Sequence, residues 1–88
     1  MFVGKVIGSI VSTRKNEKLI GSKFMIVESA MSGRTERLVA VDKVGAGIGE
    51  IVLVATGSAA RIGCNLSDAP IDAAIVGIVD DGVGLSGV

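Results

Sequence analysis

The sequence lacks histidine, tryptophan and tyrosine, and it has a single cysteine, Cys64. Without histidine, the chain is missing the commonest metal ligand and general base of proteins. One cysteine cannot form an internal disulfide, which agrees with a reducing compartment and predicts a cytoplasmic location. We therefore expect no metal site, no cofactor and no enzymatic activity.

Aromatic residues are also scarce, and neither sign of charge is in excess. Phe2 and Phe24 are the only aromatic residues, and nine basic residues balance nine acidic ones. Proteins that bind single-stranded nucleic acid stack bases on aromatic side chains along a basic groove. A net charge of zero also provides no long-range attraction to nucleic acid or to an anionic membrane. We expect neither as a partner.

Long uninterrupted apolar runs are absent as well, because charges or glycines interrupt each of them. No membrane-spanning helix is expected, and the first residues lack the apolar core of a signal peptide. Nevertheless, 49% of the 88 residues are hydrophobic. One small core cannot bury so much apolar surface. Residues 1–88 are therefore expected to form a single domain that associates with copies of itself.

The apolar pattern predicts five short strands and one helical turn. The strands are expected at residues 2–12, 23–29, 36–42, 50–55 and 71–79, and the helical turn at 59–61. The first and fourth strands carry apolar residues at both parities, which is typical of strands buried on both faces. The expected connections are residues 13–18, 30–34 and 63–69, and the glycine-rich end from 80 to 88 is expected to be partly ordered. In number and length these elements match a mainly β fold, a small five-stranded OB-like β-barrel with one short helix.

The glycines at 45, 47 and 49 lie between two carboxylates, Asp42 and Glu50. Glycine-rich loops can hold phosphates, but in nucleotide-binding motifs a helix follows the loop, and here a strand follows. Gly45, Gly47 and Gly49 are therefore predicted to form a structural turn, and a subunit contact through exposed amides is their second candidate role. Asp42 and Glu50 are predicted to accept loop amide hydrogen bonds or to pair with an arginine, and no acid/base role is expected.

A second candidate group follows the fourth strand. Gly57 and Ser58 end this strand, and Ser58 is a favourable N-cap for the helical turn. A nucleophile elbow is excluded because Ala60 replaces its second glycine. Arg61 is predicted either to offset the helix dipole or to reach a carboxylate of a neighbouring subunit. Asp72 is predicted to be a strand-edge or interface carboxylate.

Three segments resemble one known family. From Val39 the chain reads V-x-x-D-x-V-G-A-G-x-G-E-x-V-L-V-x-x-G-S-x-A-R, which resembles the signature of bacterial microcompartment vertex proteins. The N-terminal G-K-V-I-G-S-I-V-S-T-R-K resembles the first strand of that family. The segment P-I-D-A-A-I-V-G-I-V-D, from Pro70 to Asp80, resembles its last strand.

The resemblance implies the order of the barrel strands and a structural role. It implies a cyclic homopentamer that caps the vertices of a microcompartment shell in the cytoplasm, beside hexameric shell proteins that form the facets. It also favours the intersubunit role of Arg61. The short hairpin at Ser32 and Gly33 and the early end of the chain favour a catabolic organelle over a carboxysome. The alternative functions are an OB-fold module for single-stranded nucleic acid and, further behind, a small-ligand-binding oligomeric barrel.

Overall fold

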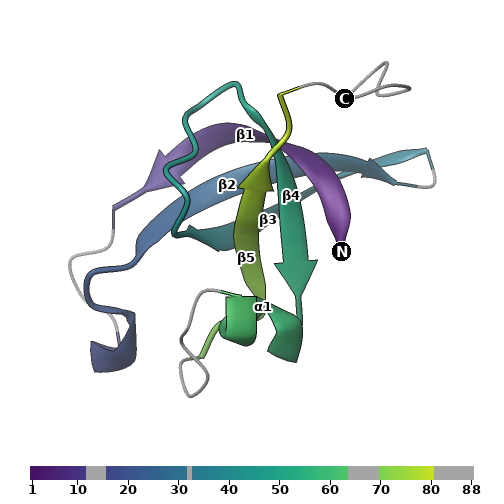
Figure 1. Cartoon of the computed structure of the whole chain (residues 1–88). Coiled ribbons are helices and arrows are strands. Elements are labelled where there is room, and N and C mark those ends of the chain that lie inside the picture. The colour runs from purple at the N-terminus through teal and green to yellow at the C-terminus, as the bar shows by residue number, and fades with distance from the viewer. Residues whose placement is uncertain (12–15, 32, 64–69, 81–88) are drawn as a thin grey trace.

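The chain folds into a closed barrel of five strands (Figure 1). The computed structural model describes residues 1–11, 16–31, 33–63 and 70–80. The elements in chain order are β1 (Phe2–Ile10), a 3-10 turn η1 (Glu17–Leu19), β2 (Lys23–Met31), β3 (Arg34–Asp42), β4 (Ile51–Thr56), α1 (Ser58–Gly63) and β5 (Ala73–Ile78). Around the barrel the strands follow the order β1-β2-β3-β5-β4. The prediction of a mainly β fold, a five-stranded barrel with one short helix, is confirmed.

All neighbouring strands are antiparallel except β3 and β5. The parallel pairing of β3 with β5 is short and consists of Val41 opposite Ala74 and Asp42 opposite Ile75. By contrast, β2 and β3 pair along their whole length. The far end of this β2–β3 hairpin therefore extends beyond the barrel (Figure 1).

Strand β1 crosses the barrel in close contact with β2. A Cβ atom added at Gly4 would lie 2.5 Å from Cγ1 of Val27 and 2.9 Å from the carbonyl oxygen of Glu28. Only glycine allows this approach, because real Cβ atoms do not come so close to backbone oxygen. Further along β1, the register shifts between Val6 and Gly8, which marks a bulge where the strand bends.

The apolar residues form two clusters, one on each side of the barrel wall. Inside the barrel, alternate residues of the strands form the main core, including Val6, Val27, Val52, Val54 and Ile75. A second cluster lies outside the barrel under α1 and contains Val41, Ala60, Ile71 and Ala74. The helix thus covers the outer side of β5, which explains why β5 is apolar at both parities.

The element bounds differ from the predictions at five places, one of which is β4, which runs from 51 to 56 instead of 50 to 55. Strand β1 ends at Ile10, and the β2–β3 connection is shorter than residues 30–34, because pairing continues to Met31 opposite Arg34. Helix α1 continues to Gly63, and β5 is shorter than predicted, from 73 to 78. Turn η1 was not predicted; the side chain of Asn16 caps it by accepting a hydrogen bond from the Lys18 amide.

Some predictions fall outside the described residues. These are the connection at 13–15, the loop at 64–69 with Cys64, the tip residue Ser32, and the chain end from 81 to 88. Among the helices that are described, none has the length and apolar character needed to cross a membrane.

Candidate functional site

The loop of residues 43–50 joins β3 to β4 and is held by the carboxylate of Asp42. One oxygen, Oδ1, accepts hydrogen bonds from the amides of Val44 at 3.0 Å and Gly45 at 3.2 Å. The other, Oδ2, accepts a hydrogen bond from the amide of Ala46 at 2.8 Å. The side chain of Asp42 is fully buried, so water cannot replace these bonds. The carboxylate therefore fixes the first half of the loop.

The residue at the centre of the loop, Ala46, enters the barrel core. It is fully buried and contacts the same cluster as Val6 and Val52. Its amide binds Asp42, and its carbonyl accepts a hydrogen bond from Nζ of Lys23 at 3.2 Å. The same Nζ lies 3.6 Å from Oδ2 of Asp42. Ala46 thus packs into the barrel core, and both its amide and its carbonyl are hydrogen-bonded.

The second half of the loop is held by Glu50 and by β1. The amide of Gly47 donates to Oε1 of Glu50 at 2.6 Å. The amide of Gly49 donates to the carbonyl of Val6 at 2.8 Å, and the amide of Val6 donates to the carbonyl of Glu50 at 3.0 Å. Both predicted carboxylates therefore accept loop amide bonds, and the cation beside Asp42 is a lysine rather than an arginine.

The three glycines of the loop have different roles. Gly45 and Gly49 have φ angles of 84° and 94°, in the left-handed region that other residues adopt only at a cost. Gly47 is not among the glycines with positive φ, and a Cβ atom there would lie 3.3 Å from Oε1 of Glu50. Its small size leaves room for the short bond between its amide and Glu50.

The second group of predicted residues lies at the other end of β4, around α1 (Figure 1). The amide of Gly57 donates to the carbonyl of Asp72 at 2.8 Å. Nη1 of Arg61 donates to the carbonyl of Ile71 at 2.9 Å. These two bonds fasten both ends of the helical turn to the residues that precede β5. Arg61 therefore has a partner within its own chain, and its predicted contact with a neighbouring subunit stays a prediction.

Ser58 does not occupy the position for which it was predicted. The helix already includes Ser58, and the carbonyl of Gly57 accepts the hydrogen bond of the Ala60 amide at 3.2 Å. Gly57, with a φ angle of 65°, is thus the residue at the N-cap. A positive φ at the end of β4 turns the chain sharply, which glycine permits and serine does not.

Sequence reasoning missed two residues of this site, Lys23 and Ala46. The sequence does contain a signal for Ala46, because it lies between Gly45 and Gly47. Two flexible neighbours allow the backbone to turn so that a small apolar side chain enters the core. Lys23 gave no signal, because its contact with Asp42 depends on the pairing of these two residues across β2 and β3.

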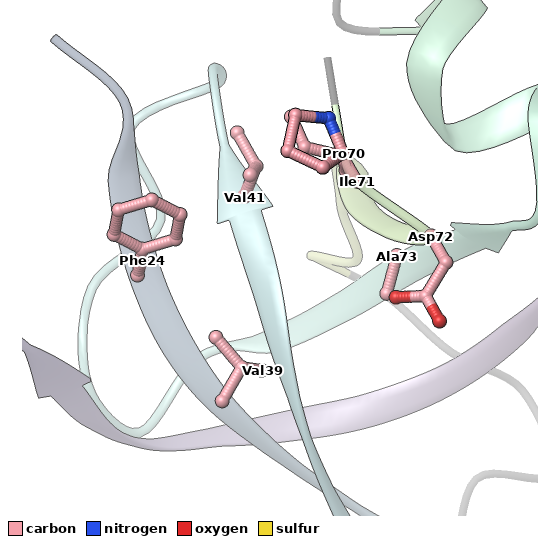
Figure 2. Close-up of a pocket in the computed structure, with 7 residues that line it drawn as sticks. All are labelled: Phe24, Val39, Val41, Pro70, Ile71, Asp72 and Ala73. Carbon is pink, nitrogen blue, oxygen red and sulfur yellow. The ribbon is translucent and has the colours of Figure 1, made fainter. Parts of the chain in front are cut away.

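A shallow pocket of about 200 Å³ lies on the outer side of the barrel. Phe24 on β2 and Val39 and Val41 on β3 line one side of it, and residues 70–73 line the other (Figure 2). Asp72 is exposed and contributes the only charge of this lining. The pocket is mainly apolar and lies where β3 and β5 pair for only two residues.

The described residues contain no group of three His, Cys, Asp or Glu side chains arranged to hold a metal ion. Both phenylalanines are half-buried: Phe2 contacts the barrel core and Phe24 lines the pocket. One half-buried phenylalanine on the outer surface is not the series of stacking platforms that single-strand binding uses, so the structure does not favour the nucleic-acid alternative.

Several known proteins that are similar to this chain are named as bacterial microcompartment shell proteins. The model of one family, described as ethanolamine utilisation protein EutN/carboxysome, matches residues 1–80. The microcompartment shell vertex protein GrpN of Rhodospirillum rubrum is 51% identical over 87 residues, covering 91% of this chain and 93% of GrpN. The shell vertex protein PduN of Salmonella typhimurium is 44% identical over 87 residues, covering 91% of this chain and 96% of PduN.

A solved structure gives the same result for the fold. The pentameric microcompartment shell protein GrpN from Rhodospirillum rubrum superposes with a TM-score of 0.79 at 50% identity. The superposition covers 94% of this chain and 98% of that one. Sequence and fold thus agree along nearly the whole length of both proteins.

Proposed function

Because the chain belongs to the EutN/CcmL family of microcompartment shell vertex proteins, we propose that it works by shape alone, as the fivefold corner piece of a shell. The observation that carries this proposal is the match to a pentameric shell protein of nearly the same length, at about half identity. Its location is the shell of a bacterial microcompartment. We also propose that residues 1–88 act as one pentamer-forming domain.

The proposed mechanism is geometric. Hexagonal tiles alone cover a plane, and a closed polyhedron needs fivefold units at its corners. A ring of five barrels supplies such a unit, and the proposed partners are the hexameric shell proteins that surround each corner. The energy of ring formation would come from apolar surface, which contributes about 25 cal/mol for each Å² removed from water.

We propose that the protein has no enzymatic activity. The two carboxylates that flank the β3–β4 loop, Asp42 and Glu50, accept amide hydrogen bonds from that loop. This supports a structural role for them and leaves no acid/base pair at this site. The catabolic type of the organelle stays a prediction, which the genes beside this one would test.

The proposal is tested first by the mass of the assembly. Five chains of 8.9 kDa form a ring of about 44.5 kDa, which native mass spectrometry distinguishes from a monomer or a hexamer. A stable monomer or hexamer at micromolar concentration would contradict the proposal.

The second test is microscopy of cells from which the gene is deleted. Facets should still form, because hexameric tiles do not need the corner piece to lie side by side, whereas closure should fail and give open or elongated shells. Normal closed shells, in a strain without another vertex protein, would refute the corner role. A filter-binding assay at physiological salt provides the control for the alternative function, and no retention of single-stranded DNA above that of a neutral protein is expected.

A further inference from the structure

Two separate faces of the barrel point apolar side chains outward. On β4, Val52 and Val54 enter the core, so the alternate residues Ile51 and Leu53 point away from it and are only half-buried. Leu53 lies opposite Val3 on β1, which is also half-buried. We call this the β1–β4 face, defined by Val3, Ile51 and Leu53.

The other apolar surface lies on β2 and β3. Phe24 is opposite Val41 and Ile26 is opposite Val39, and these four residues define the β2–β3 face. Val39 is 48% exposed, although it lies in the middle of a strand. Phe24, Val39 and Val41 of this face line one side of the pocket, and residues 70–73 line the other side (Figure 2).

The two faces are separated on both sides of the barrel. On one side, α1 packs against β4 and β5 and therefore lies between the two faces. On the other side is a charged row, in which Glu28 of β2 lies between Lys5 of β1 and Arg37 of β3. Nε of Arg37 is 3.0 Å from Oε2 of Glu28. At the level of these charges the two faces are separated, and they also differ in shape, because only the β2–β3 face borders the pocket.

We propose that the β1–β4 face of one copy covers the β2–β3 face of the next copy. This inference rests on the proposed function and names the surfaces that build the ring. The five strands close into a barrel whose inner side chains already fill the core, so the outward apolar side chains of the two faces are the surface offered to a second copy. Two unlike faces make a head-to-tail contact, and repeated contacts of this type close into a ring when the rotation between copies allows it.

Two further observations support a second copy as the occupant. The sequence pattern of β1 and β4 is that of strands buried on both faces, whereas a single chain buries only the inner one. The charges at the borders are also complementary: Lys5 is next to the β1–β4 face and Asp72 lies at the pocket of the β2–β3 face, and both are exposed. A neighbouring copy would bury the apolar residues of both faces that are exposed or half-buried in the single chain, and would bring these charges towards one another.

The test uses one lysine on each face. Val39→Lys and Leu53→Lys place a charge at positions that point outward in the single chain, so the barrel should fold while the ring is lost. Thr35→Lys is the matched control for the first, because Thr35 is an exposed outward residue of the same strand. Ser9→Lys, at an exposed position of β1, is the control for the second. Both controls should keep the wild-type assembly.

Mixing the two variants shows which face meets which. Each variant keeps one intact face, so each alone should be a monomer in native mass spectrometry. Together they should form a one-to-one heterodimer and nothing larger, because only one intact contact is possible. If each variant alone forms a dimer, the faces meet their own kind and the inference is wrong.

The outcomes separate this inference from the proposed function. A wild-type protein that is not a pentamer refutes the proposed function. A pentameric wild type whose two lysine variants stay pentameric refutes the assigned faces and leaves the function intact. If a lysine variant does not fold by circular dichroism, Val39→Thr and Leu53→Thr replace it, and at least a tenfold weaker association is then expected. Unchanged association of the folded threonine variants would equally overturn the inference.

Discussion

Asp42 is the last residue of β3, directly before the loop of residues 43–50. Replacing it should destabilise the barrel more than replacing any polar side chain of that loop. The carboxylate accepts three amide hydrogen bonds and its side chain is fully buried. A buried donor left without an acceptor costs about 1–3 kcal/mol. The full cost applies to the amide of Ala46, which is buried, and a smaller one to Val44 and Gly45, which water can reach. Asp42→Ala should therefore lower the free energy of unfolding by about 3–4 kcal/mol.

An asparagine at the same position separates hydrogen bonding from charge. Asp42→Asn keeps one acceptor oxygen, which can still bind the amides of Val44 and Gly45. Its NH₂ group then faces the amide of Ala46, and two donors meet where one bond was made. The expected loss is about 2 kcal/mol. Lys23→Met should cost at most about 1 kcal/mol, since the side chain of Lys23 is more than half exposed.

Urea unfolding at one fixed protein concentration measures these differences, because the stability of an assembled protein depends on concentration. Glu36→Gln is the control, since Glu36 is an exposed carboxylate on the same strand, and it should stay within about 0.5 kcal/mol of wild type. If Asp42→Ala is no less stable than this control, the carboxylate does not hold the loop and the reasoning fails.

Four other substitutions test the loop glycines and Arg61. Gly45→Ala and Gly49→Ala should each cost about 1–2 kcal/mol, because their φ angles are positive, and Gly47→Ala should cost less. Equal melting temperatures of all three variants would contradict this difference. Arg61→Ala should lower the free energy of unfolding by about 1–2 kcal/mol through the lost bond to the Ile71 carbonyl. Loss of the ring at unchanged unfolding free energy would instead place the role of Arg61 between subunits.

The sequence alone was sufficient for the elements that follow from local chemistry. Apolar runs between turn residues gave all five strands to within a few residues, and Gly57 correctly marked the end of β4. The order of the strands around the barrel came from the family resemblance. Periodicity does not contain this information, because the parallel contact of β3 with β5 joins residues about thirty positions apart.

The details of the site depended on tertiary contacts. The bonds of Asp42 to its own loop were within reach of sequence reasoning, since the acceptor and the donors are two to four residues apart. Lys23 reaches them only because β2 pairs with β3 in one particular register. Likewise, the predicted N-cap at Ser58 was off by one residue, because the sharp turn after β4 requires a positive φ at Gly57.

The loop and the two proposed contact faces are connected through the strands that they share. Strand β3, which carries Val39, ends at Asp42, and β4, which carries Leu53, begins directly after Glu50. The two carboxylates therefore stand where the strands of the two faces are joined by the loop. In a ring of identical subunits, the angle between the two contact faces determines how many copies close it. A loop held by a buried carboxylate and by Ala46 in the core keeps that angle constant, so a rigid corner between β3 and β4 is what a ring of defined number requires.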